Sequence, residues 1–177
     1  MIQEEEIREL VESHSDLWSK KAYKKGDLLS KAGRVATHNY YIESGIIKAF
    51  AVNEDILKEV IIGFPSAGEF VLACSSIDMQ ARMQLNLEVI EDAVIYSINA
   101  DNWNELRKLK KVTNEIIMQC LVQTSEKFIR QSVINSYPRA KTRYQKSLEN
   151  YPCISRIKDE DVASFLGFDV RTIRRIK

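Results

Sequence analysis

Short apolar runs separated by turn residues fill most of the first hundred residues. Residues 84–90 alternate polar and apolar side chains with a period of two, and the apolar run 46–52 follows a Glu-Ser-Gly turn signal. Several short strands at near-regular spacing predict an antiparallel sandwich or barrel. Residues 2–19 precede this region and carry a rough apolar face among glutamates, which predicts a helix.

Residues 104–136 contain neither proline nor glycine and predict one long helix. Apolar and small hydroxyl side chains lie three and four positions apart along it and form a wide stripe bordered by charged residues. The members of this stripe are Ile117, Met118, Leu121, Val122, Thr124, Ser125, Phe128 and Ile129. Two copies of the chain could pack along such a stripe as a short coiled coil. We therefore expect a homodimer, with a helix packed only on its own sheet as the alternative.

The last forty residues have a spacing typical of a helix-turn-helix. Pro138 ends the long helix, residues 139–150 predict a new helix, and residues 158–177 predict two short helices joined by a turn. Gly167 supplies that turn, and Asp169 can accept hydrogen bonds from the free N–H groups of the second helix. The positions expected to face inward are Val162, Ala163, Leu166, Phe168, Ile173 and Ile176.

Charge is distributed unevenly along the chain, although the net charge is only +1. Residues 137–177 hold 10 Lys and Arg against 5 Asp and Glu, whereas residues 1–136 hold 16 against 20. A positive segment suits a module that binds phosphates, and arginine on a helix in the major groove can bind guanine in a bidentate way. The residues expected to contact DNA are Val170, Arg171, Thr172, Arg174, Arg175 and Lys177. A solvated basic surface is the alternative interpretation.

Several segments of the first hundred residues carry turn glycines beside aromatic and aliphatic side chains. They are Tyr23-x-x-Gly26-Asp27-Leu28, Gly33, Tyr40-Tyr41-Ile42-x-x-Gly45, Gly68-Glu69-Phe70 and Ile95-Tyr96-Ser97-Ile98. These segments resemble the cyclic-nucleotide-binding jelly roll of Crp/Fnr-type regulators, and with the C-terminal part the resemblance covers nearly the whole chain. It implies an α+β fold: an N-terminal β jelly roll with flanking helices, a long dimerisation helix and a small C-terminal helix-turn-helix domain.

The resemblance divides the chain into a sensor domain at residues 1–110, a dimerisation helix at 111–136 and a helix-turn-helix DNA-binding domain at 137–177. It implies a homodimeric transcription regulator that binds double-stranded DNA under the control of an unidentified small-molecule effector. Many members continue into a β-hairpin wing, which we expect to be absent here because the sequence stops at Lys177. The alternative function is therefore a sensor or signalling protein whose shortened helix-turn-helix no longer binds DNA.

The nucleotide phosphate site of this family differs in the present sequence. Family members place there a Gly-Glu pair and an arginine followed by serine or threonine, because an anion needs donors and a positive charge. Here the Gly-Glu pair is missing from residues 71–76, and Arg82 is followed by Met83 and Gln84. We therefore expect cyclic AMP and cyclic GMP to be disfavoured as ligands, so that another effector, or none, occupies the pocket.

Five residues remain candidates for binding an effector. They are Arg82, Ser75 and Ser76 near the phosphate site, and Thr124 and Ser125, which match the hydroxyl pair that faces the base in members that bind cyclic AMP. The alternatives are a solvated surface arginine at position 82 and, on the long helix, hydroxyls that bond back to helix carbonyls.

The sequence has no signature of an enzyme, a metal site or a membrane span. It contains no phosphate-binding glycine loop, no paired carboxylate motif and no Ser-His or Cys-His arrangement of recognisable spacing. Its three cysteines (Cys74, Cys120 and Cys153) lie far apart, so we expect buried or idle thiols and neither a metal nor another cofactor. An acidic N-terminus and the lack of a stretch of about 18 apolar residues predict a cytoplasmic protein without a membrane partner.

Overall fold

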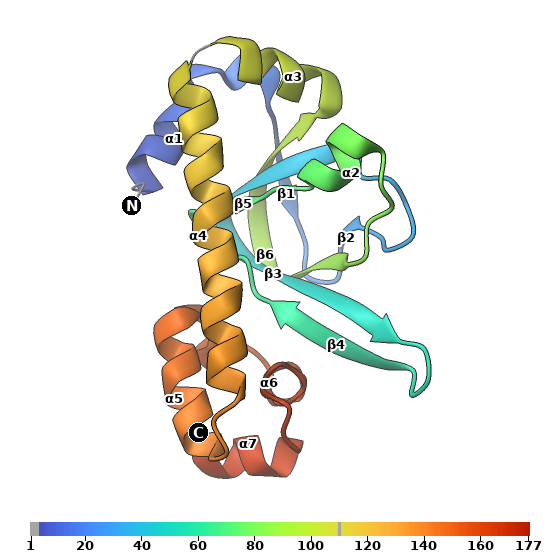
Figure 1. Ribbon diagram of the computed structural model, residues 1–177, viewed down its shortest axis with the longest axis vertical. Helices are drawn as coiled ribbons and strands as arrows, with labels where there is room; N and C mark the ends of the chain where they lie inside the picture. The colour runs from blue at the N-terminus through green and yellow to red at the C-terminus, as the bar shows by residue number, and fades with distance from the viewer. Residues whose placement is uncertain (1–3, 110) are drawn as a thin grey trace.

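The computed structural model describes residues 4–109 and 111–177 and has an α+β fold, as expected from the sequence. Within these residues, β6 pairs with β1, β2 and β3 in one antiparallel sheet, and β3 also pairs with β4 and β5. The strands are β1 (Ser19–Tyr23), β2 (Leu28–Ser30), β3 (His38–Asn53), β4 (Lys58–Gly63), β5 (Phe70–Val71) and β6 (Asn86–Asn99). The sheet curls into a roll beside a long helix (Figure 1).

Strand β3 bends at Gly45, and this bend helps to close the roll. The register between β3 and β6 shifts several times between Ile42 and Ile47. Gly45 has a φ of +94°, and a Cβ built there would lie 2.5 Å from the Cβ of Ala93. Only glycine combines this backbone conformation with such a close approach. The fully buried side chains around the bend include Ile42, Ile47, Val89 and Ile95.

Short helices pack at one end of the roll. α1 (Glu4–Ser13) is followed by the 3-10 helix η1 (Ser15–Leu17), and α2 (Cys74–Met79) lies between β5 and β6. The single helix expected for residues 2–19 is therefore too long. The chain leaves the helix after Ser13 because it turns to bury Trp18 against Phe70, with the ring centroids 5.9 Å apart.

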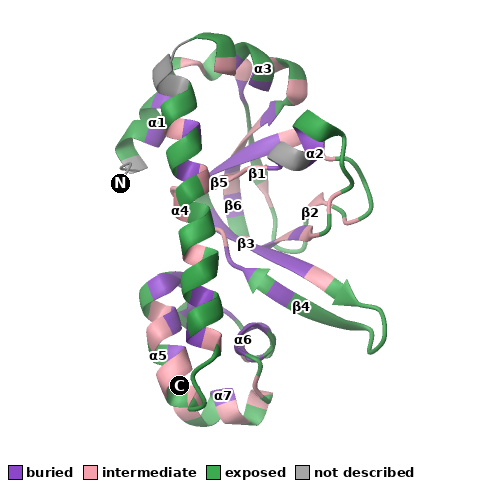
Figure 2. Ribbon diagram, viewed as in Figure 1, coloured by how far each residue is buried: buried purple, intermediate pink, exposed green. Residues whose placement is uncertain are grey.

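The helix expected for residues 104–136 is two helices in the structure. α3 (Ala100–Leu109) buries Trp103 and Leu106 at the end of the roll, whereas α4 (Lys111–Asn135) runs along the roll to the C-terminal helices (Figure 1). One straight helix could not contact both surfaces, so the expectation of a continuous helix is wrong. Lys110, between the two, lies outside the described residues. Much of the outer surface of α4 is exposed (Figure 2).

The C-terminal helices share a buried cluster with the sheet. They are α5 (Ala140–Asn150), the 3-10 helix η2 (Pro152–Arg156), α6 (Asp159–Leu166) and α7 (Val170–Ile176). Ile46 and Ile61 of the strands belong to the same buried cluster as Tyr144, Ile154 and Leu166 of the C-terminal helices. Apolar burial, the main stabilising contribution to folding, therefore fixes these helices directly to the roll.

Candidate nucleic-acid interface

The turn between α6 and α7 sets the orientation of α7, the last helix, relative to α6. Gly167 has a φ of +69°, in the left-handed region, and its N–H donates to the carbonyl of Ser164. The N–H of Phe168 donates to the carbonyl of Ala163 at 3.0 Å, which closes the turn. α6 is seen end-on in Figure 1 and α7 from the side, so the two helices cross instead of forming one rod.

The capping residue and the inward-facing residues around the turn lie where the sequence spacing predicts them. The Asp169 carboxylate accepts a hydrogen bond from the Arg171 N–H at 2.8 Å and thereby caps α7. The buried inward positions are Val162, Ala163, Leu166 and Ile173, and the half-buried ones are Phe168 and Ile176. The helix-turn-helix expected from the sequence is thus present, with its inward positions as predicted.

Arg143 on α5 supports the turn from outside, through contacts that the sequence does not indicate. Its Nη1 donates to the carbonyl of Leu166 at 2.6 Å, and its Nε donates to the carbonyl of Tyr137 at 2.7 Å. The guanidinium also lies 4.4 Å from the centre of the Phe168 ring. Arg143 therefore satisfies one of the carbonyls that the end of α6 leaves without a helical partner.

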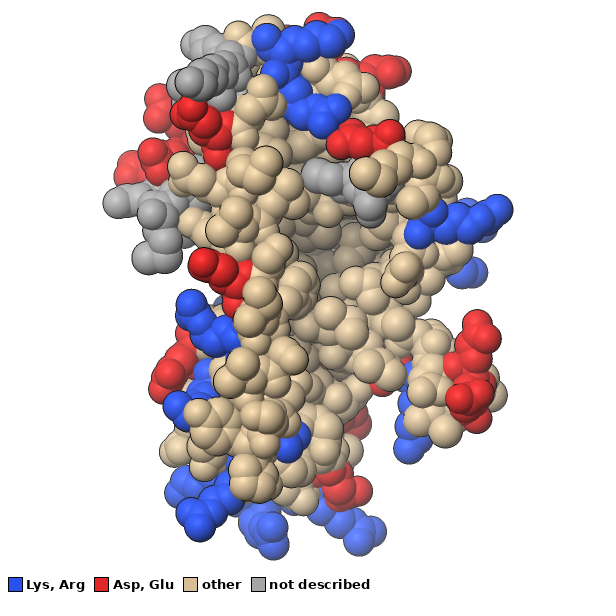
Figure 3. Space-filling model, viewed as in Figure 1, with Lys and Arg blue, Asp and Glu red and all other residues tan. Residues whose placement is uncertain are grey.

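Four of the residues expected to contact DNA are free of ion pairs within the described part of the chain. Arg171 and Arg175 are exposed, and neither side chain has a hydrogen bond or ion pair with a described residue. Thr172 and Val170 are half-buried, and Val170 packs against the shared cluster. Figure 3 shows Lys and Arg side chains gathered at this end of the molecule. These two arginines are therefore free to contact a polyanion.

Arg174 and Lys177 are paired with carboxylates at the start of α6. Arg174 Nη2 donates to Glu160 Oε1 at 2.8 Å, and Lys177 Nζ lies 2.8 Å from Asp159 Oδ1. The hydrogen bond from Lys177 lowers the pKa of Asp159, so this carboxylate remains charged at neutral pH. These two cations are therefore less available to phosphates than the unpaired arginines.

A buried lysine joins three strands of the sheet next to α6. Lys48 Nζ pairs with Glu59 at 2.6 Å and with Glu88 at 2.9 Å, and only 3% of its side chain is exposed. Burial alone lowers the pKa of Lys48, but the hydrogen bonds to the two glutamates outweigh it and raise the pKa. The hydroxyl of Ser164 on α6 donates to the carbonyl of Glu59 at 2.7 Å. β4 therefore holds α6 through the Ser164 hydrogen bond, next to an ion-pair network that joins β3, β4 and β6.

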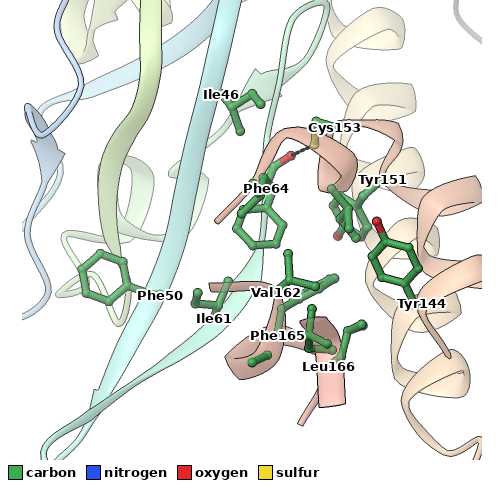
Figure 4. Close-up of a cluster of buried hydrophobic side chains, with 14 residues drawn as sticks. Ile46, Phe50, Ile61, Phe64, Tyr144, Tyr151, Cys153, Val162, Phe165 and Leu166 are labelled. Carbon is green, nitrogen blue, oxygen red and sulfur yellow. Dashed lines mark hydrogen bonds between the residues drawn. The ribbon is translucent and has the colours of Figure 1, made fainter. Parts of the chain in front are cut away.

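Three aromatic rings form the apolar part of this contact. Phe64, which follows β4, packs against Phe165 of α6 with ring centroids 5.0 Å apart. Tyr151 contacts both rings edge-on, at 6.5 Å from Phe64 and 5.3 Å from Phe165 (Figure 4). Edge-to-face pairs of this kind stabilise a contact beyond the area they bury. No sequence pattern indicates this cluster, because its members come from separate segments.

The candidate effector residues near α2 have surroundings that the sequence could not reveal. Arg82 is exposed, and its Nη1 donates to the carbonyl of Gly33 at 2.6 Å. The Ser76 hydroxyl is buried, accepts from the Ala36 N–H at 2.7 Å and donates to the carbonyl of Ala81. The side chain of Ser75 lies outside what the structure describes. The effector role of these residues remains a prediction.

The hydroxyl pair on α4 is divided between two environments. Ser125 Oγ donates to the carbonyl of Leu121 at 2.9 Å, the local bond that competes with an effector role. Thr124 has no side-chain hydrogen bond with a described residue, and it lines a cavity between α4 and the segment after β4. Only Thr124 of this pair therefore has a free hydroxyl next to an open space.

Two of the three cysteines are buried free thiols, as expected. Burial raises the pKa of Cys120 to about 11 and also raises that of Cys153, which keeps both protonated and unreactive at neutral pH. The side chain of Cys74 lies outside the described residues.

In the described ranges, no three His, Cys, Asp or Glu side chains could hold a metal ion together. No described helix has the length and apolar character needed to span a bilayer.

Residues 20–109 match the family model described as the cyclic nucleotide-binding domain. This range corresponds to the curled sheet with α2 and α3. A comparison of the sequence with curated proteins gave no match.

Comparison with solved structures finds similar folds over almost the entire chain. The c-di-GMP responsive global regulator CLP of Xanthomonas campestris has a TM-score of 0.74 and 16% identity, over 96% of this chain and 89% of CLP. FixK2 of Bradyrhizobium japonicum has a TM-score of 0.74 and 13% identity, over 90% of this chain and 82% of FixK2. A CRP/FNR-family transcriptional regulator from Thermus thermophilus has a TM-score of 0.71 and 14% identity, over 89% of this chain and 83% of its own. At these identities the likeness is one of fold.

Proposed function

Because the chain belongs to the cyclic nucleotide-binding domain family, we propose that it is a transcription regulator of Crp/Fnr type, which binds double-stranded DNA as a homodimer. The observation that carries the proposal is a helix-turn-helix whose second helix exposes two unpaired arginines, Arg171 and Arg175. The shared fold of regulators from Xanthomonas and Thermus supports it. The proposed activity is DNA binding without an enzymatic step, and the proposed location of the protein is the cytoplasm.

The proposed reading of DNA follows from the exposed side of α7. A helix of this kind fits the major groove, where arginine can donate two hydrogen bonds to O6 and N7 of guanine. Val170 offers an apolar side chain that suits a thymine methyl group. Other Lys and Arg side chains at this end of the molecule would bind phosphates, which adds affinity without sequence preference (Figure 3).

Replacing Arg175 by alanine is expected to weaken binding to the preferred duplex by about 1–3 kcal/mol, because a bidentate base contact is lost. The preferred duplex is first selected from a random pool, and the dissociation constant is then measured by fluorescence anisotropy at fixed salt. The matched control is Arg8→Ala, which removes one positive charge from α1, at the opposite end of the molecule (Figure 1).

The same titrations test DNA binding itself. Affinity for random duplex should fall steeply with salt, with a log–log slope of about −0.9 for each phosphate contact. Equal affinities for Arg175→Ala and Arg8→Ala would contradict a base contact by Arg175. A folded dimer with no salt-dependent affinity for DNA would contradict the proposed function as a whole.

The dimer is proposed from an apolar stripe on α4 that the chain itself leaves uncovered. Met118, Val122, Ile129 and Val133 are between 49% and 66% exposed and lie along one side of the helix. Contiguous exposed apolar surface of this kind marks an interaction site. A second α4 offers an identical stripe, so two copies related by a two-fold axis would cover each other.

Replacing Ile129 by glutamate is expected to convert the dimer to a monomer at micromolar concentration, because two buried carboxylates would face each other across the interface. Sedimentation velocity measures the mass directly. Val52→Glu is the control, since Val52 is 48% exposed on β3 and lies away from α4. Dissociation by both variants, or a monomeric wild-type chain, would contradict a dimer through α4.

A second function is favoured by one observation. Arg174 and Lys177 are paired with Glu160 and Asp159, so carboxylates lie beside the exposed side of α7. Negative charge there repels phosphates and would suit a sensor whose helix-turn-helix no longer binds DNA. The salt titration described above separates the two functions, because only the first predicts salt-dependent DNA affinity.

A further inference from the structure

A cavity lies where the roll, α4 and the C-terminal helices meet. Its volume is about 160 Å³, and it is lined by the segment from Gly63 to Phe70, by one side of α4 and by Tyr151. Engineered apolar cavities of roughly 150 Å³ hold a benzene molecule. The space therefore accommodates one aromatic ring.

The walls of the cavity are mainly aromatic and aliphatic. Phe70 and Tyr151 are buried, and Phe128 contributes the edge of its ring from α4. Gly63 has no side chain, and a Cβ there would lie 3.1 Å from the Tyr151 hydroxyl and 3.2 Å from the Phe128 ring. Glycine at this position lets these two rings lie directly against the sheet. A flat apolar group would be surrounded by rings here.

The polar side chains of the cavity include one cation, Lys127. Lys127 Nζ donates to Glu69 Oε1 and lies 4.1 Å from the centre of the Tyr151 ring, which leaves two of its three N–H groups for a ligand. The side chains of Gln123 and Thr124 and the hydroxyl of Tyr151 have no hydrogen-bond partner among the described residues. The one carboxylate, Glu69, already accepts from Lys127 and from the backbone of Ser66. Lys127 is therefore the one cationic donor among the lining residues.

We propose that this cavity binds a small aromatic carboxylate, with the ring between Phe70, Phe128 and Tyr151 and the carboxylate at Lys127. A ligand carboxylate can accept from the two remaining N–H groups of Lys127, and a charge-assisted bond to a partly buried ammonium is stronger than a neutral one. The site is separate from the predicted phosphate site near α2, and only Thr124 of the candidate effector residues lines it.

The position of the cavity connects such a ligand to the helix-turn-helix through one side chain, Tyr151. Tyr151 lines the cavity and also packs edge-on against Phe165 of α6, 5.3 Å away (Figure 4). A ligand that binds more tightly to one position of Tyr151 would therefore shift the equilibrium between positions of the helix-turn-helix. This effector role rests on the proposed function, whereas ligand binding itself does not.

The test uses sodium benzoate as the probe, in isothermal titration calorimetry with the full chain and no DNA. Benzoate is expected to bind saturably, with one molecule per chain. Benzylamine and benzyl alcohol have the same ring with a cation or a neutral group, and each is expected to bind at least tenfold more weakly. Absence of benzoate binding, or equal binding of benzylamine, would overturn the proposal.

Variants locate the binding site. Lys127→Met should weaken benzoate binding at least tenfold, and Arg130→Met, which removes a charge from the same helix outside the cavity, should leave it unchanged. Thr124 is exposed on α4, so Thr124→Phe can fill the cavity without disturbing the core and should abolish binding. Benzoate binding to Thr124→Phe with wild-type affinity would show that the ligand binds elsewhere. The titration contains no DNA, so a lack of benzoate binding would not contradict the proposed DNA binding. A lack of DNA binding, in turn, would not contradict benzoate binding.

Discussion

Replacing Phe64 by alanine is expected to lower the free energy of unfolding by about 3–5 kcal/mol. Phe64 is fully buried and contacts the rings of both Tyr151 and Phe165. Its removal leaves a cavity where the sheet meets the C-terminal helices, and the surrounding side chains can fill that space only in part. Urea unfolding followed by circular dichroism, at one fixed protein concentration, measures the change.

The control for Phe64→Ala removes an aromatic ring of similar size from the surface. Tyr137 is 37% exposed, and its ring lies 5.3 Å from Lys146 Nζ, so Tyr137→Ala should cost about 1 kcal/mol or less. The shared cluster also implies that the sheet and the helix-turn-helix unfold together in one transition. Two separate transitions in the wild-type chain, or equal effects of the two variants, would contradict this account of the core.

Replacing Gly45 by alanine is expected to cost about 2–5 kcal/mol of stability, although only one methyl group is added. The φ of +94° disfavours any residue with a side chain. The new Cβ would also lie 2.7 Å from the backbone oxygen of Asp92 and 2.5 Å from the Cβ of Ala93, and neither atom can move without shifting the strand. The midpoint of urea unfolding should fall accordingly.

Gly26→Ala separates the two causes in the Gly45 variant. Gly26 has a similar φ of +96°, but a Cβ there meets no atom within 4 Å. Replacing Gly26 by alanine should therefore lower the free energy of unfolding only through the unfavourable backbone conformation, by about 1–2 kcal/mol. Equal losses for the two variants would show that the close approach of β3 to β6 contributes little.

The helix-turn-helix could be predicted from the sequence because its requirements are local. Gly167 is needed for a left-handed residue, and Asp169 caps the helix that follows it, so both signals lie within a few positions of their effect. The alternation of residues 84–90 likewise predicted a strand, which the structure extends as β6. Local backbone chemistry and side-chain periodicity are what a single sequence displays directly.

The elements that could not be predicted depend on contacts between distant segments. Arg143 reaches a carbonyl 23 positions away, and Lys48 lies between glutamates of two other strands. The break between α3 and α4 has the same origin, because Trp103 and Leu106 are buried at the end of the roll. No spacing rule connects such residues, since the fold itself brings them together.

The candidate ligand sites show a further limit of prediction from residue type. A serine hydroxyl in the sequence is a potential ligand group, but Ser76 and Ser125 use theirs in hydrogen bonds to the protein backbone. The cavity beside Lys127 had no sequence signal, because its lining comes from α1, the segment around β5, α4 and the residue before η2. Which donors remain free is a property of the folded chain.

Chimeric proteins, made by joining the last forty residues to the jelly roll of a relative, would place Phe165 and Leu166 against foreign side chains. In this chain those two residues pack with Ile61 and Phe64, and Ser164 is bonded to the backbone at Glu59. A graft that keeps its original stability must therefore carry the β3–β4 hairpin with it. During divergence, substitutions in that hairpin and in α6 should arise as compensating pairs, so the helix-turn-helix is not inherited as an interchangeable unit.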